Sequence, residues 1–297
     1  MAAIEAHGLS KSFGGRPACR DVSFAAERGE VFGFLGPNGA GKTTTLRMLA
    51  GLYAPDAGSA RVAGCEISPG RPGGAELRAR VGLLTESPGF YDRLTARENL
   101  LYFAELQRAP QPGRRCDALL DRFALREHAD RPFAELSRGM KQKLAIARAL
   151  VHDPEVILLD EPTVGLDPEA TREVRGLIAD LAAGNATIVL CTHHLDEVER
   201  LCSRAAFIAG RLVGIHEIRR GNLVRIELAE PFQPDAVRAL CRSLRVSGTS
   251  LFIEPLADVP EIVAALVRAG ARVAGVTPQQ DRLEDAWLQL LAEARAA

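Results

Sequence analysis

The chain has 297 residues, 47% hydrophobic and 25% charged, the proportions of an average soluble globular protein. Its length exceeds that of one ordinary domain, so we expect a main domain of roughly 200 residues and a smaller companion. The formal net charge of -1 provides no global positive field for a nucleic-acid backbone, so we expect no nucleic-acid partner.

Cysteine use and hydropathy bear on the compartment. The six cysteines are scattered, without a Cys-x-x-Cys pair or a Cys/His cluster, and we interpret them as reduced thiols of a cytosolic protein. The amino-terminal residues lack the apolar stretch of a signal peptide, and no window reaches the roughly 18 apolar residues of a spanning helix. We expect no membrane crossing by this chain itself, and attachment through a partner stays open.

In chain order, a strand, a loop and a helix come first. The apolar run Val31 to Leu35 leads into a Gly-rich turn and then into a helix from Thr43 to Ala50, which Gly51 ends. Further short apolar runs predict buried strands, and the helices between several of them predict a mostly parallel sheet. These runs are Val81 to Leu84, Val156 to Leu159, Thr187 to Cys191 and Ala205 to Ile208. The expected fold class is therefore α/β.

A helical insertion separates the strand that ends at Leu84 from the one that begins at Val156. Thr95 to Glu98 forms a capping box ahead of a helix over residues 99–107, and Pro110 to Gly113 breaks that helix. An insertion of about 60 residues is longer than an ordinary connection. We expect a helical subdomain over about residues 86–152.

The pattern changes after about residue 218. Val224, Ile226 and Leu228 alternate with charged residues, which predicts a strand with one solvent-exposed face. An amphipathic helix over 260–270, a strand over 272–276 and a last helix over 283–291 follow. We therefore expect a main domain over residues 1–218 and a small α+β accessory domain over residues 219–297.

The Gly-rich turn satisfies G-x-x-x-x-G-K-[ST] directly after a strand and at a helix start. Glycines let backbone N–H groups converge on phosphates, the helix start adds its positive dipole end, and Lys42 supplies a charge. A Gly-rich turn without a ligand is the weaker alternative in this context. We predict that ATP binds at Gly36, Pro37, Asn38, Gly39, Ala40, Gly41, Lys42, Thr43 and Thr44, with the Thr43 hydroxyl offered to Mg²⁺.

Two carboxylates, Asp160 and Glu161, follow the strand that begins at Val156. Ligands of open α/β sheets collect at this end of the strands. Asp160 can hold the Mg²⁺ shell through water, and Glu161 can polarise the attacking water as a base. An acidic strand end that only caps the next turn is the alternative, and the phosphate loop in the same chain weakens it.

Three more motifs complete a set of five in a fixed order: Leu136-Ser137-Arg138-Gly139-Met140, Gly165-Leu166-Asp167 and Thr192-His193. With these motifs, residues 4 to about 215 resemble the nucleotide-binding subunit of an ABC transporter. The resemblance implies a P-loop NTPase core and ATP hydrolysis. It also implies that two subunits sandwich two ATP molecules; a homodimer is the favoured arrangement, and a heterodimer stays open.

The resemblance assigns further site residues. Ser137 and Gly139 would present the start of a helix to the phosphates of the opposite subunit, and Asp167 would couple the two sites. His193 would contact the γ-phosphate and act in hydrolysis, and the adjacent His194 is a less favoured alternative for this role. Phe13 stands where the family stacks an aromatic ring on adenine, although a lone Phe is more often part of a core.

The sequence departs from the family at three places. Arg138 replaces a glycine of the signature motif, and Met140 replaces its glutamine. Glu86 stands where the family's Q-loop glutamine is expected. It could accept a hydrogen bond from water or contact Mg²⁺, but it adds a negative charge beside the phosphates.

The run from Glu86 to Leu100 and residues 283–288 resemble the ATPases of ABC-2 type exporters, including those for antibiotic and drug efflux. The likeness implies a separate membrane permease, whose coupling helix would meet Phe90, Tyr91 and Leu94, and a place on the cytoplasmic face of the cell membrane. The other interpretation of these three residues is a folded surface loop without a partner. A soluble ABC ATPase of translation or DNA repair, or a regulatory module that binds ATP without hydrolysis, are the alternative functions.

Overall fold

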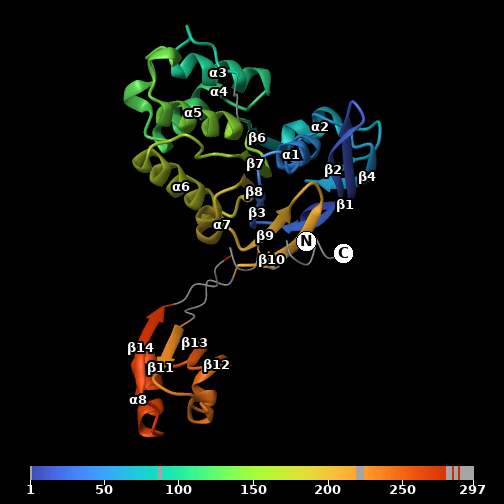
Figure 1. Ribbon diagram of the computed structural model, residues 1–297. Helices are drawn as coiled ribbons and strands as arrows, with labels where there is room; N and C mark the ends of the chain where they lie inside the picture. Colours follow the sequence, from blue (N-terminus) through green and yellow to red (C-terminus); the bar gives the residue numbers. More distant parts are fainter. Residues whose placement is uncertain (1, 86–88, 219–223, 279–282, 284–286, 288–297) are drawn as a thin grey trace. The chain divides into compact units, whose positions relative to one another are not determined.

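The computed structural model describes residues 2–85, 89–218, 224–278, 283 and 287. These residues form two compact units, one that extends to Glu217 and one that starts at Ile218 (Figure 1). No helix in the described part of the chain is long and apolar enough to span a membrane.

A six-stranded sheet forms the centre of the first unit, in the order β10-β9-β3-β8-β7-β6. All neighbouring strands from β9 to β6 run parallel, and β10 is antiparallel to β9. The strands are β3 (Val31–Leu35), β6 (Val81–Leu84), β7 (Val156–Asp160), β8 (Thr187–Thr192), β9 (Arg204–Ile208) and β10 (Leu212–Glu217). The predicted α/β class with a mostly parallel sheet is confirmed.

A second, antiparallel sheet in the first unit has the order β2-β1-β4-β5. Its strands are β1 (Ala2–Phe13), β2 (Arg16–Glu27), β4 (Ala57–Val62) and β5 (Cys65–Ile67). The ring of Phe24 in β2 lies 5.3 Å from Phe32 and 4.8 Å from Phe34 of β3, measured between centroids. These three rings belong to one buried cluster that joins the two sheets, and burial of such large apolar surfaces stabilises their contact.

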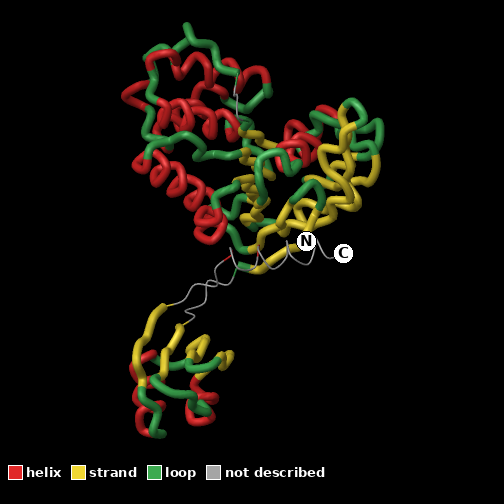
Figure 2. The backbone as a smooth tube through the Cα atoms, viewed as in Figure 1, coloured by secondary structure: helices red, strands yellow, loops and turns green. Residues whose placement is uncertain are grey.

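Helices connect the parallel strands and cover the sheet (Figures 1 and 2). They are α1 (Lys42–Leu49), α2 (Gly74–Arg80), α6 (Pro168–Ala183) and α7 (Leu195–Leu201). Between β6 and β7 lie α3 (Ala96–Leu106), α4 (Pro112–Arg122), α5 (Arg138–Leu150) and the single-turn helices η1 (Arg126–His128) and η2 (Phe133–Glu135). Figure 1 shows α3, α4 and α5 gathered at one end of this unit.

The capping box that opens α3 is present. The Thr95 hydroxyl accepts a hydrogen bond from the Glu98 backbone at 3.1 Å, and the Glu98 carboxylate accepts one from the Thr95 backbone at 2.8 Å. The predicted break after α3 ends sooner than expected. Pro112 and Gly113 already belong to α4, because the first turn of a helix tolerates a proline that has no N–H to donate.

The second unit is a four-stranded antiparallel sheet in the order β12-β13-β11-β14, with α8 and the short helix η3 packed on its core. Its elements are β11 (Val224–Leu228), η3 (Asp235–Leu240), β12 (Cys241–Ser247), β13 (Ser250–Pro255), α8 (Val259–Arg268) and β14 (Val273–Pro278). Val224, Ile226 and Leu228 are buried while Glu227 is exposed, as the alternation predicted. The helix expected over residues 283–291 lies almost entirely outside the described residues.

Candidate functional site

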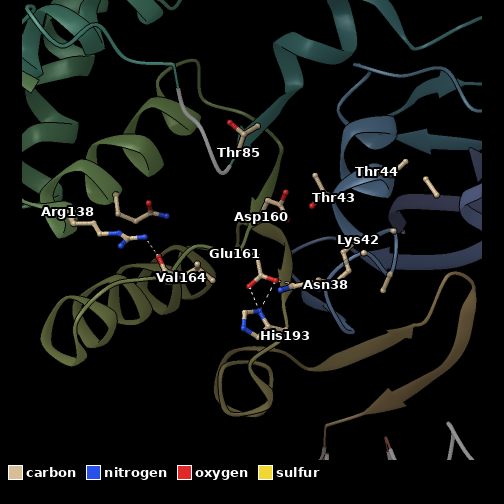
Figure 3. A pocket seen from close by; sticks show the side chains of 15 residues that line it. Asn38, Lys42, Thr43, Thr44, Thr85, Arg138, Asp160, Glu161, Val164 and His193 are labelled. Atoms are coloured by element: carbon tan, nitrogen blue, oxygen red, sulfur yellow. Dashed lines mark hydrogen bonds and ion pairs between the residues drawn. The ribbon is translucent and has the colours of Figure 1, made fainter. Parts of the chain in front are cut away.

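A cavity of about 680 Å³ opens at the carboxyl ends of β3 and β7 (Figure 3). The predicted site residues that line it are Asn38, Gly39, Ala40, Gly41, Lys42, Thr43, Thr44, Asp160, Glu161 and His193. The fold therefore brings the phosphate-loop motif, the strand-end carboxylates and the histidine after β8 together around one space.

The loop after β3 curls around the ammonium group of Lys42. Its Nζ donates hydrogen bonds to the carbonyls of Gly36 at 2.6 Å and Pro37 at 3.2 Å. Gly36 and Pro37 thus contact Lys42 and do not line the cavity. Gly41, just before α1, has a φ of +98°, and a Cβ there would lie 2.4 Å from the Ala18 carbonyl oxygen, so only glycine fits.

Asp160 ends β7 in a buried position. Its side chain is 5% exposed, and burial raises the pKa of its carboxyl while a hydrogen bond with Thr43 lowers it less. Its Oδ1 is buried without a hydrogen-bond partner among the described residues. A carboxylate oxygen without a partner beside a threonine hydroxyl is a donor set that suits Mg²⁺, so Thr43 and Asp160 fit the predicted metal.

Glu161 meets two basic side chains in the cavity. Its carboxylate oxygens lie 2.9 and 3.1 Å from Nδ1 of His193, and Oε1 lies 3.4 Å from Nζ of Lys42. Figure 3 shows Glu161 and His193 facing each other on the cavity wall. Glu161 itself has a left-handed backbone, with a φ of +48°, which is strained for a residue with a side chain.

His194 lies beside His193. Its backbone N–H donates to the Thr192 hydroxyl at 3.0 Å, and its ring lies 4.1 Å from the His193 ring, between centroids. Only His193 of the two lines the cavity. The geometry therefore favours His193 for the predicted contact with the reacting groups.

Three predicted residues lie at the starts of helices and do not line the cavity. Ser137 is the N-cap of α5, and its hydroxyl accepts a hydrogen bond from the Met140 backbone at 3.2 Å. Asp167 is the N-cap of α6, and the hydrogen bond from the Ala170 backbone lowers the pKa of its carboxyl. Gly139 is buried against α6, where an added Cβ would lie 2.9 Å from that of Ala170.

Phe13 and Glu86 stand apart from the other predicted residues. Phe13 is 46% exposed, packs edge-on against Tyr53 with centroids 5.3 Å apart, and does not line the cavity. Its exposure means that it is not a core residue. Glu86 lies outside the described residues.

The structure adds cavity residues that the sequence interpretation did not assign: Ala18, Thr85, Arg138, Gln142 and Val164. The Gln142 side chain donates to the Pro162 carbonyl at 2.7 Å, and Arg138 donates to the Val164 carbonyl at 3.4 Å. Arg138 and Gln142 are four residues apart on α5 and so share one face of the helix. That spacing is the signal that could have paired them.

The aromatic residues after β6 are divided between core and surface. Phe90 is partly buried between Phe103 and Phe133, with centroids 5.7 and 4.7 Å away. Tyr91 is 47% exposed and lies edge-on to the exposed Tyr102, with centroids 5.2 Å apart. Tyr91 and Tyr102 thus form an exposed aromatic pair on the helical subdomain.

The sequence of this chain is similar to those of known ATP-binding proteins. Residues 19–164 match the family described as ABC transporter. The chain is similar to Nod factor export ATP-binding protein I of Paraburkholderia xenovorans, at 40% identity over 97% of each chain, and to that of Rhizobium johnstonii, at 36% identity over 97% of this chain and 94% of the relative.

Solved structures agree. The ATP-binding subunit of an ABC transporter is 31% identical, with a TM-score of 0.64 over 73% of this chain and 90% of that one. A dimeric ATP-binding cassette in a post-hydrolysis state with ADP and Pi is 25% identical, with a TM-score of 0.65 over 73% of this chain and 99% of that one. Together with the motifs gathered around one cavity, these likenesses show that the chain belongs to the ABC transporter family, as an ATP-binding subunit that hydrolyses ATP.

Proposed function

We propose that two copies of this chain bind Mg-ATP between them and that hydrolysis drives export through a separate membrane permease of the ABC-2 type. The contact of Glu161 with both His193 and Lys42 is the observation that carries this proposal. The relatives named above are export proteins, which favours export over a soluble ATPase of translation or DNA repair.

Lys42 and Glu161 have complementary parts in the proposed reaction. Lys42 is 5% exposed and would place its charge against the ATP phosphates. Because phosphate oxygens would compete with Glu161 for the ammonium, ATP binding would free the carboxylate to accept a proton from the attacking water. His193, hydrogen-bonded to that carboxylate, would hold it in place.

Thr43 and Asp160 would hold Mg²⁺ through the hydroxyl and the carboxylate oxygen that lacks a partner. The ion supplies positive charge that stabilises the phosphate oxygens during transfer.

The second copy would supply the residues that one chain leaves outside its cavity. Ser137 caps the start of α5, where backbone N–H groups and the helix dipole suit an anion. Ser137 and Gly139 would face the phosphate loop of the other copy and close the site. Asp167 would contact the other copy and couple the two sites. The dimeric cassette with ADP and Pi supports a dimer of this kind.

The permease would dock on the helical subdomain, at the exposed pair of Tyr91 and Tyr102. Exposed aromatic side chains are favoured at protein interfaces because they bury a large apolar area at low conformational cost. This contact would hold the chain on the cytoplasmic face of the cell membrane.

The test is Glu161→Gln. The amide keeps the size of the side chain but accepts no proton, so ATP turnover should fall by about 100-fold or more while ATP affinity stays within about twofold. Phosphate release and titration with labelled ATP measure the two quantities. Glu76→Gln, which changes an exposed carboxylate that pairs with Arg80, is the matched control and should leave both unchanged. Turnover near the parental rate in Glu161→Gln would remove Glu161 from the proposed role.

A further inference from the structure

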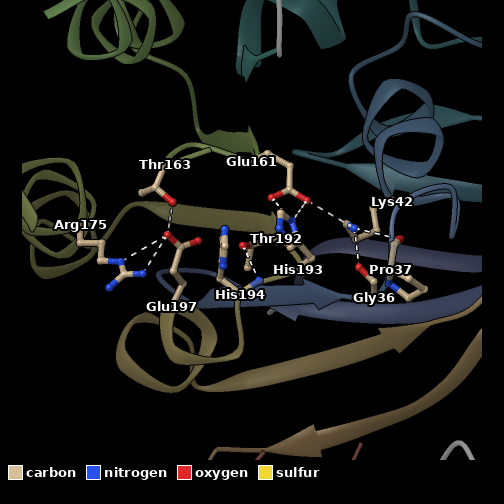
Figure 4. A network of polar contacts seen from close by, with 10 residues as sticks. All are labelled: Gly36, Pro37, Lys42, Glu161, Thr163, Arg175, Thr192, His193, His194 and Glu197. Atoms are coloured by element: carbon tan, nitrogen blue, oxygen red, sulfur yellow. Dashed lines mark hydrogen bonds and ion pairs between the residues drawn. The ribbon is translucent and has the colours of Figure 1, made fainter. Parts of the chain in front are cut away.

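A buried carboxylate lies behind the cavity and belongs to none of the motifs. Glu197 is in the first turn of α7, and its side chain is 1% exposed. Its Oε1 accepts hydrogen bonds from the Thr163 hydroxyl and from Nε and Nη2 of Arg175, both at 3.3 Å (Figure 4). Three donors therefore converge on one oxygen atom.

These contacts join three segments of the chain. Thr163 lies in the loop between β7 and α6, two residues after Glu161. Arg175 lies within α6, and it also contacts the exposed Asp196 at 2.8 Å. Glu197 lies in the first turn of α7, and its backbone N–H donates to the His194 carbonyl at 3.2 Å. One carboxylate thus ties the loop after Glu161 to the helix that follows the two histidines.

The loop after Glu161 needs such a fixed point. Glu161 has a left-handed backbone, which persists only where the neighbouring residues hold it. On one side, Gln142 of α5 holds the Pro162 carbonyl at 2.7 Å. On the other side, Glu197 holds the next residue, Thr163. Loss of either contact would let the Glu161 carboxylate move relative to His193.

Glu197 has a feature that stability alone does not explain. Its Oε2 is buried without a hydrogen-bond partner among the described residues. A buried carboxylate with one unsatisfied oxygen costs folding free energy. A role in the reaction would account for keeping it.

We propose that Glu197 is a positioning residue for ATP hydrolysis, which fixes the Glu161 carboxylate against the His193 ring by tying Thr163 and Arg175 to the start of α7. The inference rests on the proposed roles of Glu161 and His193. Glu197 touches neither ATP nor the attacking water, so its effect passes through the geometry of those two residues.

The experiment compares Glu197→Gln with Asp196→Asn in the full chain. Glu197→Gln weakens the charged hydrogen bonds, so kcat should fall between about tenfold and 100-fold, while KM and the affinity for ATP stay within about twofold. Asp196→Asn removes the exposed carboxylate that shares Arg175 and should change none of them. A kcat of Glu197→Gln within about twofold of the parent overturns the proposal.

A second variant covers the case in which Glu197→Gln does not fold. Thr163→Val keeps the shape of the side chain and removes the hydroxyl, and it should lower kcat with the ATP affinity unchanged. If both variants fold, their effects on kcat should be less than additive, because both break the same contact. Thr163→Val with parental kcat overturns the proposal, as does an equal loss of ATP affinity and kcat.

The same measurements separate this inference from the proposed function. If the parent chain hydrolyses ATP and Glu161→Gln stops turnover while Glu197→Gln does not, only the positioning role fails. If Glu161→Gln hydrolyses ATP at the parental rate, the proposed function fails and the role of Glu197 fails with it.

Discussion

Burial makes the ionised carboxylate of Asp160 less favourable in the folded chain than in the unfolded chain. Burial raises the pKa of its carboxyl, with a smaller opposing effect of Thr43. The folded chain therefore binds a proton more tightly at this position than the unfolded chain. Its contribution to stability is most favourable below the ordinary pKa of Asp, and it falls as pH rises through the raised pKa.

This sign leads to a prediction for Asp160→Asn. At neutral pH the amide avoids the cost of a buried charge, so the first unit of the nucleotide-free protein should melt a few °C higher, by about 2–4 °C for each 1 kcal/mol. The added stability that Mg-ATP gives the parent should be lost, because the proposed metal ligand is gone. Thermal melts with and without Mg-ATP measure both effects. A lower melting temperature of the nucleotide-free variant would contradict the account.

At the residue scale, the grouping of side chains at the strand ends was predictable, and a contact between a helix and a loop was not. Asp160 ends β7, Glu161 and His193 directly follow β7 and β8, and Lys42 opens the helix after β3. Strand ends of a parallel sheet meet at one edge. The contact of Gln142 with Pro162 joins a helix to a loop twenty positions away. Nothing in the spacing of the chain specifies it.

At the scale of elements, the parallel strands could be predicted from the sequence because they are continuous apolar runs. The antiparallel sheet was not predicted. In β1 and β2 the buried residues alternate with polar ones, several of them are small alanines, and register shifts interrupt the alternation. A strict two-residue period is the signal for such strands. The register shifts between β1 and β2 remove this two-residue period.

Glu30, just before β3, links two parallel strands. Its carboxylate contacts Arg204 at the start of β9 at 2.7 Å and accepts a hydrogen bond from Ser203 at 2.9 Å. Burial by itself would raise the pKa of Glu30, but the hydrogen bonds from Arg204, the Glu27 backbone and Ser203 outweigh it, and the pKa is lowered. This stabilisation is present at neutral pH and is lost as pH falls through the lowered pKa.

We expect Glu30→Gln to lower the free energy of unfolding by about 1–3 kcal/mol at pH 7, because the ion pair loses its charge. The difference from the parent should shrink as pH falls from the ordinary pKa of Glu, about 4.3, and should vanish below the lowered pKa of the folded chain, where Glu30 of the parent is also neutral. Urea unfolding at a series of pH values measures this. A pH-independent difference would show that lost packing, and not charge, is responsible.

At the scale of the whole molecule, each compact unit has a hydrophobic core of its own. The core of the second unit includes Ile226, Leu251 and Ile262, which are all buried. The pattern change near residue 218 predicted a separate domain, and the structure divides the chain after Glu217. That residues 219–297 form an accessory domain with its own role stays a prediction.

Two cores predict two unfolding transitions in calorimetry of the full chain. Mg-ATP should raise only the transition of the first unit, because the ligand binds only that unit. Ile226→Ala should lower only the other transition, by about 2–5 kcal/mol, since it leaves a cavity in the second core. The rate of phosphate release by Ile226→Ala should equal that of the parent. A single transition that both changes shift together would contradict independent units.

The contact of Arg138 with Gly165 has a consequence for any alignment or redesign of this protein. Gly165 has a φ of +71°, and a Cβ there would lie 2.0 Å from the guanidinium of Arg138. A side chain at position 165 would therefore displace the guanidinium of Arg138, and the left-handed backbone there would strain any residue other than glycine. Homologues that carry arginine in the signature motif should therefore keep glycine at the position of Gly165, since this backbone and this close guanidinium leave no room for a side chain.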